Sequence, residues 1–277
     1  TIDAAIVMRR LQYVGFSEFQ ANDLYGQLKG LAQTLINLPQ VFSMALAISL
    51  VPAISDAYAR KKKEEIKSII SSGVRVTLLI GLPCALGLFV LGKPIIRLLY
   101  FKNTAEALDS TGEILQYLSF GVIFLTLVQS LTAILQGLGR TMIPVRNLLI
   151  GAITKTILTY VLTGIPSVNV KGAAISTVVA YMIASTLDLI SVKKYAKMEF
   201  KTGEVFIRPL ISAIGMAIMA NVGHIVFTPL VGDRIATILA IFVGAIVYFL
   251  FLIRTGSITY DDFKLIPKGE KIAKILV

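Results

Sequence analysis

The sequence predicts an all-α membrane protein whose helices cross the bilayer several times. Hydrophobic residues make up 56% of the 277 residues and charged residues only 16%, whereas soluble domains carry about 25% charged residues. Long stretches without charge recur along the chain, and unsatisfied backbone groups exclude open strands from the bilayer. Because a helix needs about 20 apolar residues to cross, we expect a bundle of about seven full transmembrane helices plus a truncated one.

The uncharged stretches give the expected position of each crossing. Residues 1–14 resemble the end of one further helix, and the sequence starts with Thr1 inside it. We therefore expect the chain to begin within a larger protein. The full spans are expected near residues 31–54, 73–92, 114–136, 144–164, 170–191, 208–228 and 234–253.

Basic residues predict the orientation of the bundle. They concentrate in alternate connections, around residues 60–75, 140–146, 193–208 and after 253. The positive-inside rule places these connections in the cytoplasm, so we expect a cytoplasmic C-terminus and residues 15–29 outside. The net charge of +11 then belongs to loops, and no nucleic-acid partner is expected.

The expected organisation follows from these spans. The amphipathic segment 93–100 should lie along the outer interface. The chain divides into a truncated helix (1–14), the helices of one lobe (15–191), a basic cytoplasmic loop (192–207), two last transmembrane helices (208–253) and a cytoplasmic tail (254–277).

Lys155 is the main candidate functional residue. It lies alone in an apolar span, nine residues after Arg146, so roughly 13 Å along a helix. An ammonium group at that depth costs roughly 3 kcal/mol on insertion scales. We expect it either to face an anionic substrate or to pair with a buried carboxylate, for which Asp188 and Asp3 are the candidates.

Polar side chains recur at helical spacing on several spans and suggest a wet cavity, because lipid-facing amides are penalised. The alternative is hydrogen bonding between helices. Arg9 and Arg10 would be either an interfacial anchor or the outer part of a cationic cavity. The candidate cavity residues beside Lys155 are Gln33, Asn37, Gln129, Thr159, Arg9 and Arg10.

The sequence lacks the residues that catalysis would need. It has one cysteine and one histidine, so no disulfide framework, metal site or cofactor is expected. No phosphate-binding glycine loop or nucleophile motif is present. A membrane glycosyltransferase or ligase would need carboxylates or histidines grouped at the interface, and is disfavoured. A non-transporting membrane scaffold stays open at this point.

Several motifs resemble a known family. They are Leu24–Ser43 with Ala47–Ser55, Ile2–Arg10, Leu135–Arg140 and Asp262–Gly269. Together they are similar to the stage V sporulation protein B and polysaccharide biosynthesis proteins of the multidrug/oligosaccharidyl-lipid/polysaccharide exporter superfamily. The resemblance covers nearly the whole chain.

The resemblance implies two lobes around a central cavity, with this chain as the second lobe plus two extra helices and the N-terminal lobe as its partner. In the related lipid II flippases, basic cavity residues meet the substrate pyrophosphate, and the last two helices form a groove for the lipid tail. Arg9 and Arg10 belong to the helix that carries one such arginine, although the local spacing differs here.

The leading expectation is a flippase that exports a lipid-linked anionic sugar precursor of the undecaprenyl-pyrophosphate type by alternating access. It would work in the cytoplasmic membrane of a bacterium, in cell-envelope or spore-cortex biogenesis. The alternative is a cation-coupled multidrug antiporter of the same superfamily. That activity would call for membrane-embedded carboxylates, and only Asp3 and Asp188 qualify.

Overall fold

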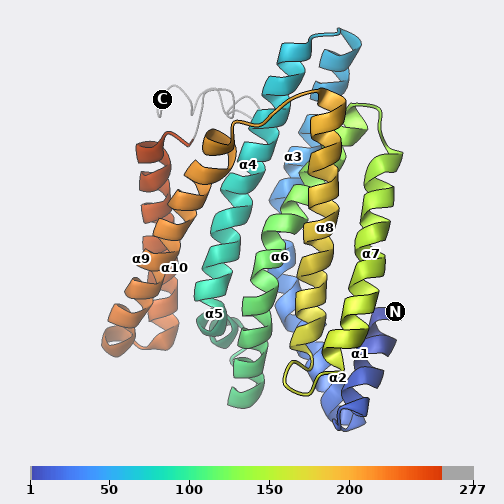
Figure 1. The fold of residues 1–277 in the computed structure, drawn as a ribbon. Helices are drawn as coiled ribbons and strands as arrows, with labels where there is room; N and C mark the ends of the chain where they lie inside the picture. The colour runs from blue at the N-terminus through green and yellow to red at the C-terminus, as the bar shows by residue number, and fades with distance from the viewer. Residues whose placement is uncertain (1, 258–277) are drawn as a thin grey trace.

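The computed structural model describes residues 2–257 and contains helices but no strand within that range. Long helices run up and down beside one another (Figure 1). Seven helical segments of the described chain are long and apolar enough to cross a membrane. The predicted fold class is confirmed.

The helices extend beyond most of the predicted spans, because uncharged stretches mark only the hydrocarbon crossing. The elements in chain order are α1 (Ile2–Tyr13), α2 (Glu18–Gly26), the π-helix η1 (Gln27–Ala32), α3 (Gln33–Ala59), α4 (Lys63–Val90), α5 (Gly92–Leu99), α6 (Ala105–Gly137), α7 (Met142–Thr163), α8 (Lys171–Ala196), the π-helix η2 (Gly203–Ile207), α9 (Arg208–Val231) and α10 (Asp233–Thr255).

The expected connection at residues 15–29 is largely helical instead. The α2, η1 and α3 elements form one segment from Glu18 to Ala59. The Ser17 side chain accepts from the Gln20 backbone, and the Ser17 backbone N–H donates to the Gln20 side chain. This reciprocal capping starts the helix early, and Lys29 therefore lies in a helix rather than in a loop.

Two other expected segments differ in extent. The basic loop 192–207 is shorter than predicted, because α8 continues to Ala196 and η2 leads directly into α9. The short helix α5 occupies the predicted amphipathic segment. The predicted tail lies mainly in residues 258–277, outside the described residues.

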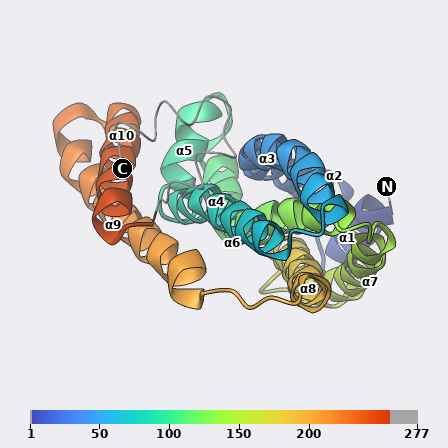
Figure 2. The ribbon, with the colours of Figure 1, turned by 90° about the horizontal axis from the view of Figure 1, so that it is seen from above.

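Helix α6 forms the centre of the bundle. It packs against α3, α4 and α8, and the view along the helices shows it between them (Figure 2). Its fully buried residues Ile114, Leu118, Leu131 and Ile134 belong to the two main apolar clusters. Between membrane helices such packing is driven by van der Waals contact.

Glycines bring α7 and α8 into close contact. A Cβ added at Gly172 would lie 2.6 Å from the carbonyl carbon of Leu162, and one at Gly151 would lie 2.8 Å from the carbonyl oxygen of Ala180. Neither backbone atom could move aside for a side chain, so the close packing of α7 on α8 requires glycine at these two positions.

Gly172→Ala is expected to lower the free energy of unfolding by about 2 kcal/mol, since overpacking typically costs roughly 1–3 kcal/mol. Thermal unfolding of the purified protein in detergent measures the effect. Gly26→Ala is the matched control, because nothing lies within 4 Å of its added Cβ. Equal stability of the two variants would contradict the close contact.

Helices α9 and α10 form a hairpin at one side of the molecule (Figure 2). They pack mainly on each other and reach the remaining helices through α4 and α5. The Tyr248 hydroxyl donates to the Leu79 carbonyl oxygen over 2.7 Å, and Leu91 with Ala220 and Ala240 forms a small buried cluster. The hairpin is therefore joined to the bundle along a narrow seam.

Candidate functional site

Three charged side chains from separate parts of the chain meet where α1, η1 and α7 lie together. The Lys155 amine lies 3.1 Å and the Lys29 amine 3.0 Å from the same carboxylate oxygen, Oδ2 of Asp3. The side chains of Lys155, Lys29 and Asp3 are 23%, 31% and 24% exposed, respectively. We call these three residues the charge triad.

Packing of α1 against α7 positions Asp3. Arg10 donates from Nε to the Tyr160 carbonyl oxygen over 3.0 Å. Its guanidinium carbon lies 4.4 Å from the ring centroid of Tyr160 and 4.7 Å from that of Tyr13. Such cation–π contacts add to the hydrogen bond. Arg10 thus joins the C-terminal parts of α1 and α7. Arg9, in contrast, is exposed.

The charge triad lies far from the ends of α7. Lys155 is eight residues before the helix end at Thr163 and thirteen after its start at Met142, or roughly 12 Å and 20 Å along the axis. Charges at such depth face the bundle interior or a water-filled space. Two cations share one anion, so the charge triad carries one surplus positive charge.

Lys155 is therefore not a lone charge, because Asp3 lies beside it. Asp188, the other candidate partner, is only 1% exposed and accepts a hydrogen bond from the Asn147 side chain over 2.8 Å. This contact joins α7 to α8 and does not involve Lys155. The carboxylate beside Lys155 comes instead from α1, at the other end of the lobe in sequence.

Thr159 does not line an open space, contrary to expectation. It is 1% exposed, and its hydroxyl lies 2.6 Å from that of Ser176. Helical spacing places Thr159 one turn beyond Lys155, but α8 covers that position. The hydroxyl pair is an interhelical contact within the α7–α8 hairpin.

The predicted amides are not bonded to the charge triad. Gln33 is half-buried, and its side-chain oxygen lacks a hydrogen-bond partner among the described residues. Asn37 is exposed one turn further along α3, and Gln129 is half-buried on α6. The ion pairs of the charge triad within residues 2–257 involve only its own members. The three amides remain candidates for substrate contact.

Lys29 is not among the site residues that the sequence predicts. It stands just before an uncharged stretch, where a connection is expected. The signal that identifies its position is the capping pair Ser17 and Gln20, which starts the helix eleven residues earlier, at Glu18. Lys29 then lies roughly 16 Å inside the helix.

A groove of about 420 Å³ lies between α3, α4, α5, α9 and α10. We refer to it as the apolar groove. Its lining comes from both the main bundle and the α9–α10 hairpin. The lining includes Leu38, Phe42, Cys84, Met216, Ala245 and Tyr248.

The described residues contain no group of three or more His, Cys, Asp or Glu side chains that could hold a metal ion. The chemistry available at the charge triad is that of two ammonium groups around one carboxylate. Such a site can attract and hold anionic oxygens.

These features define a multi-pass, all-helical membrane protein with two lysines around one aspartate at half-buried positions of its spanning helices. Residues 30–255 match the family described as "Lipid II flippase MurJ". The chain belongs to this family, which is one of flippases and not a class of enzymes.

Similar curated proteins are about twice as long as this chain. "Uncharacterized membrane protein YabM" of Bacillus subtilis (strain 168) is 27% identical over 95% of this chain and 50% of its own length. "Stage V sporulation protein B" of the same organism is 27% identical over 95% of this chain and 49% of its length. The chain spans about half the length of these relatives.

Two solved structures share the fold. "Lipid II flippase MurJ, inward closed conformation" superposes with a TM-score of 0.69 at 19% identity and covers 91% of this chain and 50% of the other. A multidrug resistance MATE family transporter of the MOP superfamily, in an inward-facing conformation, gives a TM-score of 0.52 at 14% identity, over 99% and 69%. The resemblance to flippase-type proteins predicted from the motifs is confirmed by the family match over residues 30–255.

Proposed function

We propose that this chain is the second lobe of a flippase that exports a lipid-linked anionic sugar precursor by alternating access. The observation that carries the proposal is the surplus positive charge of the charge triad at membrane depth. A pyrophosphate offers several anionic oxygens to two ammonium groups. Charge-assisted hydrogen bonds of this kind are roughly twice as strong as neutral ones.

Binding of the pyrophosphate would be reversible, because Lys155 and Lys29 can exchange it for Asp3. Without substrate, Asp3 holds both ammonium groups in place. With substrate, a pyrophosphate oxygen approaches Lys155 and Lys29 while Asp3 competes with it for both. This competition moderates the affinity, and a substrate that must leave on the opposite side needs moderate affinity.

The apolar groove supports a lipid-linked substrate. Its lining consists mainly of aliphatic, aromatic and sulfur-containing side chains of five helices. Burial of apolar surface contributes about 25 cal/mol per Å², so a long polyprenyl chain gains binding energy there. A sugar without a lipid carrier has no apolar chain that could bind in this groove.

The proposal also includes an N-terminal lobe, an orientation in the membrane and a biological role. The relatives' length suggests an N-terminal lobe that forms the other cavity wall. The basic connections favour a cytoplasmic C-terminus, with α5 on the outer side of a bacterial cytoplasmic membrane. A role in polysaccharide, peptidoglycan or spore-cortex biogenesis fits a substrate of this class.

Binding and flipping by the intact protein test the proposal. An undecaprenyl-pyrophosphate sugar should bind more tightly than the same sugar on a neutral polyprenol, and should cross the membrane of proteoliposomes. Equal binding of the two lipids would contradict a role for positive charge. Sodium- or proton-driven efflux of a cationic dye would instead favour the multidrug antiporter suggested by the weaker structural match.

Ala245→Trp is expected to reduce flipping by roughly tenfold or more, because the indole fills part of the apolar groove and removes apolar contacts worth at least about 1.4 kcal/mol. Ala245 is exposed on α10, so the unfolding temperature should not change. Phe242→Trp, at an exposed position on α10 that does not line the groove, is the control. Normal flipping by Ala245→Trp would remove the groove from the proposed path.

A further inference from the structure

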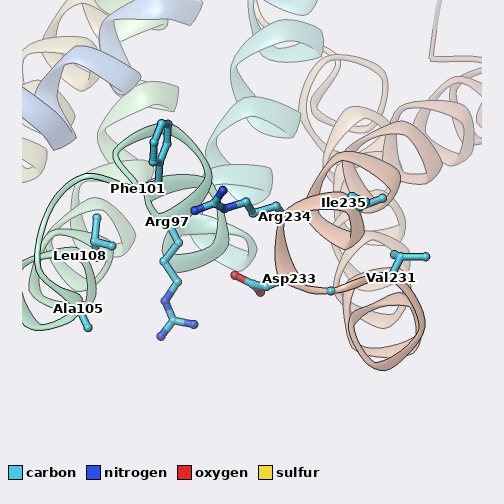
Figure 3. Close-up of a pocket in the computed structure, with 9 residues that line it drawn as sticks. Arg97, Phe101, Ala105, Leu108, Val231, Asp233, Arg234 and Ile235 are labelled. Atoms are coloured by element: carbon cyan, nitrogen blue, oxygen red, sulfur yellow. The ribbon is translucent and has the colours of Figure 1, made fainter.

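A second pocket, of about 600 Å³, opens between α5, the start of α6 and the turn that joins α9 to α10. Figure 3 shows its lining, with Arg97 and Phe101 on one side and Asp233, Arg234 and Ile235 contributed by the α9–α10 hairpin. We call it the headgroup pocket. It lies at the ends of the spanning helices and shares no lining residue with the apolar groove.

The headgroup pocket contains two guanidinium groups with free donors. Arg97 directs Nε and Nη2 to one oxygen of Asp109, at 3.2 and 2.6 Å, and its Nη1 makes no hydrogen bond within residues 2–257. Arg234 stacks over Phe101, with 5.0 Å from its guanidinium carbon to the ring centroid. No carboxylate of the described chain pairs with Arg234. Both groups can therefore donate to an anion.

The same pocket also presents a carboxylate oxygen. Oδ1 of Asp233 lies 3.1 Å from Nε2 of His224, whereas Oδ2 has no partner within the part of the chain that the structure describes. The carboxylate projects into the space near the side chains of Arg97 and Arg234 (Figure 3). An occupant that satisfies all these groups must carry a negative and a positive charge close together.

Apolar side chains surround the charged ones. Phe101 is 53%, Ile235 54% and Val231 41% exposed. At the end of a membrane helix such residues contact acyl chains and the lower headgroup region, while arginine reaches outward to phosphates. A pocket with this composition, at this depth, suits a phospholipid rather than a soluble ion.

We propose that the headgroup pocket binds an aminophospholipid, with phosphatidylethanolamine as its simplest form. The phosphate diester accepts hydrogen bonds from Arg234 and from Nη1 of Arg97, and arginine's planar fork suits this geometry. The primary ammonium donates to Oδ2 of Asp233. The acyl chains lie over Phe101 and Ile235. This site is independent of the proposed transport substrate.

The pattern of lipid preference tests the proposal. The intact protein, freed of lipid in detergent, is titrated with short-chain phosphatidylethanolamine, phosphatidylglycerol, phosphatidylcholine and inorganic phosphate, and bound lipid is counted by native mass spectrometry. Phosphatidylethanolamine should bind most tightly, because choline has no N–H group and glycerol has no charge for Asp233. Inorganic phosphate should compete poorly.

Two substitutions separate the two charges. Arg234→Gln should weaken the binding of all three phospholipids by roughly tenfold, the effect of one lost charge-assisted contact. Asp233→Asn should weaken phosphatidylethanolamine alone and bring it level with phosphatidylglycerol. Lys102→Gln removes an exposed charge at the same end of the bundle and should change nothing.

The order in which the unsubstituted protein binds the three phospholipids and inorganic phosphate can overturn the proposal by itself, even if a variant fails to fold. Phosphatidylglycerol binding at least as tightly as phosphatidylethanolamine would show that Asp233 does not recognise the headgroup. Equal competition by inorganic phosphate would reduce the site to an anion site. Because bound lipid is measured directly, a protein that lacks flippase activity can still pass this test.

Discussion

Asp3→Asn is expected to lower the free energy of unfolding by about 3 kcal/mol, the low end for breaking a buried ion pair. The asparagine leaves the ammonium groups of Lys29 and Lys155 near each other at membrane depth with no anion between them. The low end applies because the Asp3 side chain is 24% exposed. Thermal unfolding in detergent measures the loss.

A double variant shows whether charge is the cause. Adding Lys155→Met to Asp3→Asn removes one of the two ammonium groups and should restore much of the lost stability, a coupling that interacting residues show. Asp56→Asn, which removes the exposed pair of Asp56 with Arg60, should cost less than about 1 kcal/mol. Additive effects of the two triad substitutions would contradict the pairing.

Lys155→Met is expected to reduce flipping of an undecaprenyl-pyrophosphate sugar by at least roughly tenfold, the effect of one lost charge-assisted contact. The protein should remain folded, because Lys29 still neutralises Asp3 at 3.0 Å. The charge triad then has no surplus charge for a pyrophosphate. Flipping in proteoliposomes and substrate binding by the intact protein measure the loss.

Two controls accompany this prediction. Lys155→Arg keeps the charge and should retain most of the flipping activity. Lys171→Met removes a lysine that pairs with Glu113 at the α5 end of the bundle, and it should have little effect on flipping. Wild-type flipping by Lys155→Met would exclude the charge triad from the transport mechanism.

Much of the fold could be predicted because hydrophobic length is a local property. The uncharged stretch 235–253 lies within α10, and the amphipathic stretch 93–100 nearly coincides with α5. The boundaries were less predictable, since charged residues such as Lys63 and Glu64 continue α4 beyond the hydrocarbon region. A residue's charge marks where the bilayer ends and not where the helix ends.

The candidate site was predicted only in part. Depth alone identified Lys155, because its helix is apolar on both sides of it. Its neighbours Asp3 and Lys29 come from other helices, and no spacing rule within one helix can pair them. The same limit explains why Thr159 was predicted to line the cavity. Its spacing places it on the same face of α7 as Lys155, but spacing within one helix does not show that α8 covers it.

The π-helical turn η1 determines how the helix that carries Lys29 is wound. A π turn holds one residue more than the α-helical ladder needs, and each residue of an α-helix turns the chain by about 100°. If Gln27–Ala32 tightened into α geometry, the helix on one side of the turn would rotate by roughly that angle relative to the other. Lys29 lies inside this turn, so the extra residue of the π turn sets the direction in which its ammonium projects and brings it to Asp3.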